Sequence, residues 1–277
     1  MVYLSRGARK YLAMPKSITR HRTICISDIH LGSRHCQARV LMDFLDRNDA
    51  DTIYLIGDII DAWKIHANKW RWTSDQSGVI QKLLKKARHG TRIIYILGNH
   101  DEFLRPYLQH NLNFGEIEIA NQWEHIDAQG RRWLLTHGDL FDGISRVHRW
   151  IGFLGDSAYD FVLWLNTYYN RLRHALGFGY WSMAKFLKHR VKKAVDFIYQ
   201  FETNLGAYCK KRGFDGVICG HIHHAEIKTI DGVTYMNDGD WVDSCTALVE
   251  DETGEWRIIA WKQGARDVDI VDYSGPC

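Results

Sequence analysis

The segment of the sequence that decides the fold is TICISDIHLG, at residues 23–32. Its first half is an apolar, largely β-branched run, and its second half carries Asp28 and His30. Short apolar runs of this kind predict buried strands of a parallel sheet, so the polar motif is expected in the loop where the strand ends. The same order, an apolar run followed by a polar motif, recurs as TIYLIGD at 52–58 and RIIYILGNHD at 92–101.

Two further motifs lie later in the chain, THGD at 136–139 and GHIH at 220–223. Loops at strand ends carry the chemistry of open α/β sheets, because the scaffold holds them rigidly while a ligand can still reach them. Carboxylate, imidazole and amide donors without a thiolate favour Mn²⁺, Fe or Zn²⁺ in a reactive rather than a structural site. The pattern therefore predicts a site for two divalent metals, with seven candidate ligands: Asp28, His30, Asp58, Asn99, His137, His221 and His223.

Strand–helix units alternate along residues 23–110, with helices expected near 36–48 and 76–89. Such alternation predicts a mainly parallel sheet with helices outside it. Residues 116–136 and 215–261 instead resemble short strands separated by hairpin turns. We therefore expect an α/β fold with two sheets packed face to face and helices on the outer sides, a four-layer αββα sandwich.

A chain of 277 residues with 45% apolar and 25% charged residues is an ordinary globular composition. It is near the upper size for one core, so we expect one catalytic domain, residues 23–143 and 213–265, that carries an insertion. Residues 1–22 are basic and lack the apolar core of a secretory signal. They are expected to form a basic tail, and the protein is expected in the cytoplasm, with peripheral contact to the inner membrane as an alternative.

Residues 144–212 form the expected insertion, a helical cap. This segment holds twelve Lys and Arg against four acidic residues, a formal charge of +8, whereas the whole chain carries +3. An apolar stripe along 182–210 predicts an amphipathic helix. One interpretation is that the cap helices only pack on the sandwich. The other is a cap that is apolar within and basic outside, suited to an acylated anionic substrate at a membrane surface.

The order of these motifs resembles that of the calcineurin-like metallophosphoesterase superfamily, from about Thr23 to Trp261. Within it, the sequence is most similar to the UDP-2,3-diacylglucosamine pyrophosphatase family, which acts in lipid A metabolism. The residues that carry this narrower resemblance are SDIHLG at 27–32, GDIIDAW at 57–63, THGD at 136–139 and GDW at 239–241.

The resemblance implies how the candidate residues divide their roles. Asp58 would bridge two metal ions, with Mn²⁺ the first choice and Fe, Zn²⁺ or Mg²⁺ as alternatives. Asp28, His30 and His223 would complete one metal site, and Asn99, His137 and His221 the other. His100 would be the general acid for the leaving oxygen, oriented by Asp61, and Asn99 and His100 would contact the substrate.

The sequence departs from the pyrophosphatase family at GNHD, where that family has an arginine in place of His100. This sequence also has an aspartate, Asp61, where the pyrophosphatase family has a glutamate. These departures keep a second function open, a soluble phosphomonoesterase or cyclic-nucleotide phosphodiesterase. The expected partner is a phosphorylated substrate, nucleotide-linked or acylated, and a nucleic-acid substrate is not expected. Three tryptophans after Asp58 can form a substrate rim or a part of the core: Trp63, Trp70 and Trp72.

Overall fold

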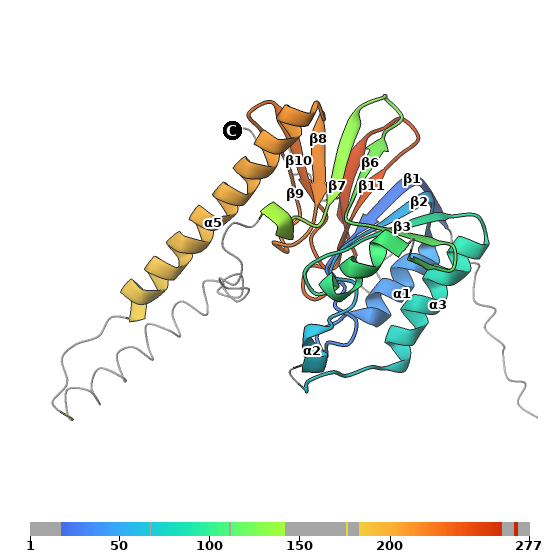
Figure 1. Ribbon diagram of the computed structural model, residues 1–277, viewed down its shortest axis with the longest axis horizontal. Helices are drawn as coiled ribbons and strands as arrows, with labels where there is room; N and C mark the ends of the chain where they lie inside the picture. Colours follow the sequence, from blue (N-terminus) through green and yellow to red (C-terminus); the bar gives the residue numbers. More distant parts are fainter. Residues whose placement is uncertain are drawn as a thin grey trace, which may run out of the picture.

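The computed structural model describes residues 18–66, 68–110, 112–141, 176, 183–261 and 269–270. Two β-sheets pack face to face and helices cover both outer sides (Figure 1). This arrangement confirms the predicted α/β fold of two sheets flanked by helices. Helices α1 (Ala38–Arg47) and α3 (Ser74–Arg88) cover the first sheet, and α5 (Met183–Arg212) covers the second.

The first sheet has the order β13-β12-β11-β1-β2-β3-β5-β4. Its central strands β1, β2, β3 and β5 are parallel, so their carboxyl ends meet at one edge of the sheet. The strands are β1 (Thr19–Ile26), β2 (Asn48–Ile56), β3 (Arg92–Ile96), β4 (Asn113–Phe114), β5 (Ile117–Ala120), β11 (Thr246–Glu250), β12 (Trp256–Ala260) and β13 (Asp269–Ile270).

The second sheet has the order β6-β7-β8-β10-β9, with β7, β8 and β10 parallel. Its strands are β6 (Gln122–Ile126), β7 (Arg132–Thr136), β8 (Gly216–Cys219), β9 (Glu226–Ile230) and β10 (Val233–Asn237). Short helices lie in the loops that follow the strands: α2 (Trp63–His66), η1 (Glu102–His110) and η2 (Asp139–Phe141).

The alternation of side chains along β1 explains why its last three residues, 24–26, are apolar without interruption. Ile24 and Ile26 point to the core under α1 and α3, whereas Cys25 between them points to the core between the sheets. All three side chains are fully buried. A strand buried on both faces needs apolar residues at every position, since neither face meets water.

Two expectations about the flanking segments need adjustment. Strand β1 begins at Thr19 and not at Thr23, because residues 19–22 continue the ladder with β2, where Thr19 pairs with Asn48. On α5, Val195 of the expected apolar stripe is 59% exposed, because this part of the helix has no sheet beneath it. The tail up to residue 17 and the cap residues 144–175 and 177–182 lie outside the described residues.

The side chain of Asp127 stabilises the turn of the hairpin between β6 and β7 through hydrogen bonds. Its buried carboxylate accepts hydrogen bonds from Trp133 Nε1 at 2.8 Å and from Arg131 Nε at 2.6 Å. It also accepts the backbone N–H groups of Gln129 and Arg131, both at 2.9 Å. Burial alone would raise the pKa of this carboxyl, but the hydrogen bonds from Trp133 and Arg131 outweigh it and lower the pKa below its usual value.

We expect Asp127→Ala to lower the free energy of unfolding by about 2–3 kcal/mol at neutral pH, because it leaves charged and buried donors without their acceptor. A depressed folded-state pKa contributes stability above the unfolded value of about 4, and this contribution is lost as the pH falls through the folded value. The difference between wild type and variant should therefore shrink in acid. Urea unfolding at pH 7 and pH 3 measures it, and an equal difference at both would contradict a role for the ionised carboxylate.

Candidate metal centre

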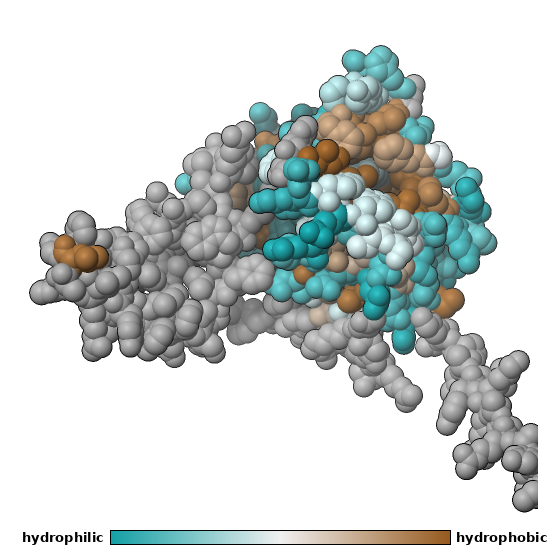
Figure 2. Space-filling model, turned by 90° about the horizontal axis from the view of Figure 1, so that it is seen from below, coloured by the Kyte–Doolittle hydropathy of each residue, from teal (hydrophilic) through white to brown (hydrophobic). Residues whose placement is uncertain are grey.

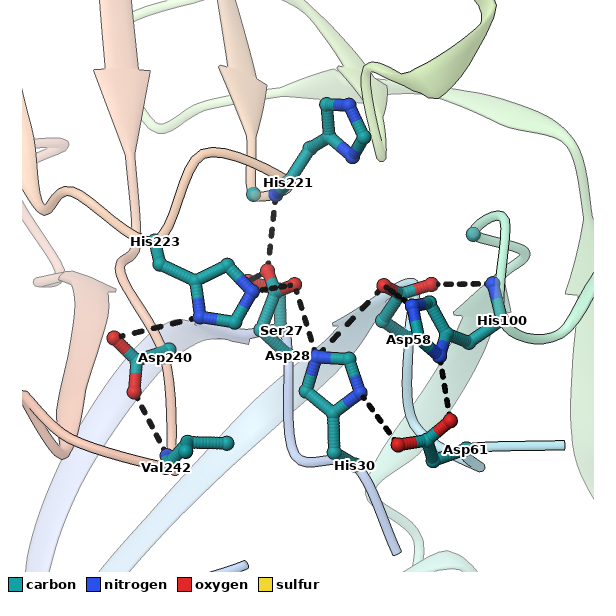
Figure 3. A network of polar contacts seen from close by, with 12 residues as sticks. Ser27, Asp28, His30, Asp58, Asp61, His100, His221, His223, Asp240 and Val242 are labelled. Atoms are coloured by element: carbon teal, nitrogen blue, oxygen red, sulfur yellow. Dashed lines mark hydrogen bonds and ion pairs between the residues drawn. The ribbon is translucent and has the colours of Figure 1, made fainter. Parts of the chain in front are cut away.

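Buried imidazoles and carboxylates converge where the motif loops leave the carboxyl ends of the strands (Figure 3). Within the described residues, three groups have donor atoms close enough to hold a metal ion. The groups share members, so they form one continuous centre. They are Asp28 with His30 and His223, Asp28 with Asp58 and His137, and His30 with Asp61 and His100.

Asp58, in the loop after β2, lies at the middle of this centre. Its Oδ1 atom is 3.5 Å from Nε2 of His137, and its Oδ2 atom is 3.8 Å from Nε2 of His30. Burial would raise the pKa of Asp58, but the neighbouring His137 outweighs it and holds the pKa well below its usual range. The carboxylate is therefore ionised and presents one oxygen to each side of the centre.

Asp28, in the loop after β1, belongs to two of the three groups. Its Oδ1 atom is 3.0 Å from Nε2 of His223 and 3.6 Å from Nε2 of His30. The other ring nitrogen of His223, Nδ1, faces Asp240 Oδ2 at 3.8 Å. A carboxylate behind the ring in this way fixes the orientation of a ligating imidazole.

Several donor atoms in the centre are buried and have no hydrogen-bond partner among the described residues, namely His30 Nε2, Asn99 Oδ1 and His137 Nε2. Buried polar atoms are nearly always satisfied, so a cluster of unsatisfied ones at a single place indicates a ligand. The hydrogen bond from His137 Nδ1 to the Ile56 carbonyl, at 2.9 Å, leaves Nε2 free to bind a cation. These donors fit divalent metal ions.

The pKa values of two histidines also indicate a place for positive charge. Burial alone would lower the pKa of His137, but the Asp58 carboxylate outweighs it and raises the pKa to about 10. Burial opposes a high pKa at His30 too, yet the neighbouring carboxylates of Asp28 and Asp61 raise it to about 9. The carboxylates thus stabilise positive charge beside them, and a divalent metal ion supplies such a charge.

Many of the candidate ligands lie in strained backbone. A positive φ is uncommon outside glycine, and such residues cluster at functional sites, where the surrounding structure holds them in place. The backbone therefore turns sharply at the end of each strand and aims the side chain inward. Five of the seven candidates have this conformation: Asp28 (φ 50°), His30 (φ 52°), Asp58 (φ 53°), His221 (φ 71°) and His223 (φ 56°).

Gly98, after β3, allows two motif loops to approach each other closely. A Cβ atom at this position would lie 2.4 Å from Asp58 Oδ1 and 2.9 Å from His137 Cδ2. Any larger residue would therefore displace the carboxylate at the middle of the centre. This contact explains why the motif begins with glycine.

His100 and Asp61 form a pair beside the centre, as the resemblance implied. His100 Nδ1 is 2.6 Å from Asp61 Oδ1, and the opposite nitrogen, Nε2, is 3.6 Å from Asp58 Oδ2. The indole of Trp63 stacks on the imidazole, with ring centroids 4.0 Å apart. Trp63 therefore lies at the edge of the metal centre and not in the core, and 39% of the residue is exposed.

The structure places one of the seven candidates less centrally. The ring of His221 is turned away from Asp28 and His223 (Figure 3) and lies against His137, with centroids 5.1 Å apart. Asn99 is half-buried. His221 belongs to none of the three groups of donor atoms found within the described residues.

Asp101, the last residue of GNHD, has a role that sequence reasoning did not assign. Its carboxylate accepts the backbone N–H groups of Ile59 at 3.1 Å and Ile60 at 2.8 Å, and so ties the loop after β3 to the loop after β2. Burial and the charge of Asp58 raise the pKa of Asp101 to about 6. The orienting role of Asp240 was also missed, although its Gly-Asp-Trp motif was a visible signal.

Comparison with known proteins agrees with this geometry. The family model described as calcineurin-like phosphoesterase matches residues 21–225. UDP-2,3-diacylglucosamine hydrolase of Aeromonas salmonicida (strain A449) is 27% identical over 85% of this chain and 92% of that protein. The protein of the same name from Porphyromonas gingivalis (strain ATCC BAA-308 / W83) is 29% identical, but over 43% of this chain and 47% of that protein.

A solved structure of a phosphoesterase from E. coli superimposes over 89% of this chain and 96% of that chain, with a TM-score of 0.44 and 14% identity. The family model covers well over half of the sequence, including the loops after β1, β2, β3, β7 and β8. The chain therefore belongs to the calcineurin-like phosphoesterase family and is a metal-dependent phosphohydrolase.

Proposed function

We propose that this enzyme hydrolyses the phosphoanhydride of UDP-2,3-diacylglucosamine, or of a closely related nucleotide-linked and acylated substrate, as a step of lipid A metabolism. The observation that supports this substrate is the match to the A. salmonicida hydrolase, which spans 92% of that protein. The convergent donors around Asp58 support the reaction type, since phosphoryl transfer is served by two metals that share a carboxylate.

In this proposal Asp28, His30 and His223 would hold one ion, Asn99, His137 and His221 would hold a second, and Asp58 would be shared by both. When bound, divalent metals supply Lewis-acid polarisation of the phosphoryl oxygens and activate the attacking water. The donor set of carboxylate, imidazole and amide suits Mn²⁺, which is our first choice, with Fe, Zn²⁺ or Mg²⁺ as alternatives.

Two side chains of the protein, His100 and Asp61, then provide the proton for the leaving oxygen. His100 Nε2 faces the centre and donates a proton to the leaving oxygen, while Asp61 accepts the hydrogen bond from Nδ1 and fixes the tautomer. Asn99 and His100 also contact the substrate. Trp63 holds the plane of the imidazole by stacking on it.

An acylated substrate also requires apolar surface near the centre. Large apolar side chains are exposed in the loops that follow β2 and β3, among them Trp63, Phe103 and Tyr107. On the face seen in Figure 2, hydrophobic residues form separate patches among hydrophilic ones. The exposed side chains of Trp63, Phe103 and Tyr107 support contact with acyl chains at the surface of the inner membrane, from the cytoplasmic side. Among the described residues, no helix is both long and apolar enough to cross a membrane.

A second candidate function is that of a soluble phosphomonoesterase or cyclic-nucleotide phosphodiesterase. The pairing of His100 with Asp61, at 2.6 Å, favours it, because this pair provides a general acid for leaving groups poorer than a phosphate.

The test is the release of UMP from UDP-2,3-diacylglucosamine in detergent by Mn²⁺-loaded protein, beside bis-p-nitrophenyl phosphate. Under the proposal, UMP appears and its release is lost in Asp58→Ala. Turnover of the aryl ester without UMP release would refute the substrate and leave the two-metal reaction standing.

A further inference from the structure

Helix α5 reaches the candidate metal centre through a buried side chain, Phe201. The side chain is 1% exposed and belongs to the core between α5 and the second sheet. A Cβ atom on Gly138 would lie 2.6 Å from Phe201 Cζ, so the ring packs directly on the backbone that follows His137. Gly138 has a φ of 114°, a conformation that only glycine adopts readily. The loop after β7 is thus shaped to receive this ring.

The same ring contacts His221. The centroids of Phe201 and His221 are 5.8 Å apart, and those of His137 and His221 are 5.1 Å apart. The backbone N–H of His221 donates to Asp28 Oδ2 at 3.0 Å, so the main chain is held on the side of Asp28 while the ring lies on the side of His137. The imidazole thus contacts two rings, those of Phe201 and His137, and these contacts favour its place on the side of His137.

We propose that Phe201 is a positioning residue for the metal centre: it holds the His221 imidazole beside His137, so that both rings serve the same metal ion. This inference rests on the proposed two-metal function. A histidine side chain has several staggered rotamers, and packing against a flat, buried ring restricts them. Groups that orient a ligand in this way typically change metal affinity by about 10–100-fold when they are lost.

The position of Phe201 makes the contact specific. Among the described side chains of α5, those of residues 195–200 are exposed or half-buried, and Phe201 is the first that is buried against the second sheet. Leu205 is 0% exposed in the same core, four residues further along α5. Leu205 therefore offers a control in which the core is damaged and the ring beside His221 is retained.

The experiment is a titration of the metal-free full-length protein with Mn²⁺, which measures the number and affinity of bound ions. Electron paramagnetic resonance of the same samples distinguishes a coupled Mn²⁺ pair from single ions. The variants are Phe201→Leu, which keeps an apolar side chain but removes the ring, and Leu205→Ala. Phe201→Met, whose unbranched side chain adapts better to the space left by the ring, replaces Phe201→Leu if that protein does not fold.

We expect wild type and Leu205→Ala to bind two ions with the same affinities and to give the signal of a coupled pair. Phe201→Leu should bind one ion normally and the other about 10–100-fold more weakly, with the coupled signal restored by excess Mn²⁺. Unchanged affinities in Phe201→Leu, or equal weakening in Leu205→Ala, would overturn the inference. Fewer than two ions in the wild type would instead refute the two-metal function itself, and the inference with it.

Discussion

Replacement of Asp58 by alanine is expected to lower turnover of bis-p-nitrophenyl phosphate by at least about 10³-fold, which corresponds to about 4 kcal/mol of lost transition-state stabilisation. Asp58 is 2% exposed and presents one carboxylate oxygen towards His137 and the other towards His30. Its removal leaves the two sides of the centre without a shared ligand. Steady-state kinetics over a range of Mn²⁺ concentrations measure the loss, which excess metal should not restore.

Asp51→Ala is the matched control for this variant. Asp51 lies on the same strand, β2, but near its amino end, and its exposed carboxylate pairs with Arg20. Exposed ion pairs contribute about 0–1 kcal/mol, so this variant should keep wild-type turnover. Full activity in Asp58→Ala, or an equal loss in Asp51→Ala, would exclude Asp58 as the bridging ligand.

The second large effect is expected at His100, and it should depend on the leaving group. We expect His100→Ala to lower kcat by about 10²–10⁴-fold for diesters with a phenolate leaving group, because the proton donor is lost. The loss should be smaller for p-nitrophenolate, which leaves without needing that proton. Rates across an aryl diester series measure this dependence.

Asp61→Asn tests the pair of His100 and Asp61 by changing the carboxylate instead of the imidazole. Asp61 Oδ1 is 2.6 Å from His100 Nδ1, so the variant should steepen the dependence on the leaving group in the same direction. His35→Ala, at an exposed histidine in the loop after β1, is the control and should leave all rates unchanged. A uniform loss for every leaving group in His100→Ala would indicate substrate binding and not proton transfer.

Much of the fold was predictable because it follows from local pattern. Continuous apolar runs such as residues 24–26 occur where a strand is buried on both faces, and the end of β1 has this burial. The strand–helix alternation and the hairpin turns likewise follow from patterns of residues close in sequence, and the structure confirms both. The start of β1 at Thr19 was not predictable, since it depends on pairing with β2, a contact distant in sequence.

The sequence by itself determined the order of the motif loops, the types of donor that they carry and the membership of the phosphoesterase family. These features depend on residues a few positions apart, which share a strand and the turn that follows it. Only the tertiary structure decided that Asp240 faces His223, that Asp101 joins two loops and that Phe201 contacts His221. Such contacts join residues on different elements of the sandwich, so they form only when the sheets and α5 pack together.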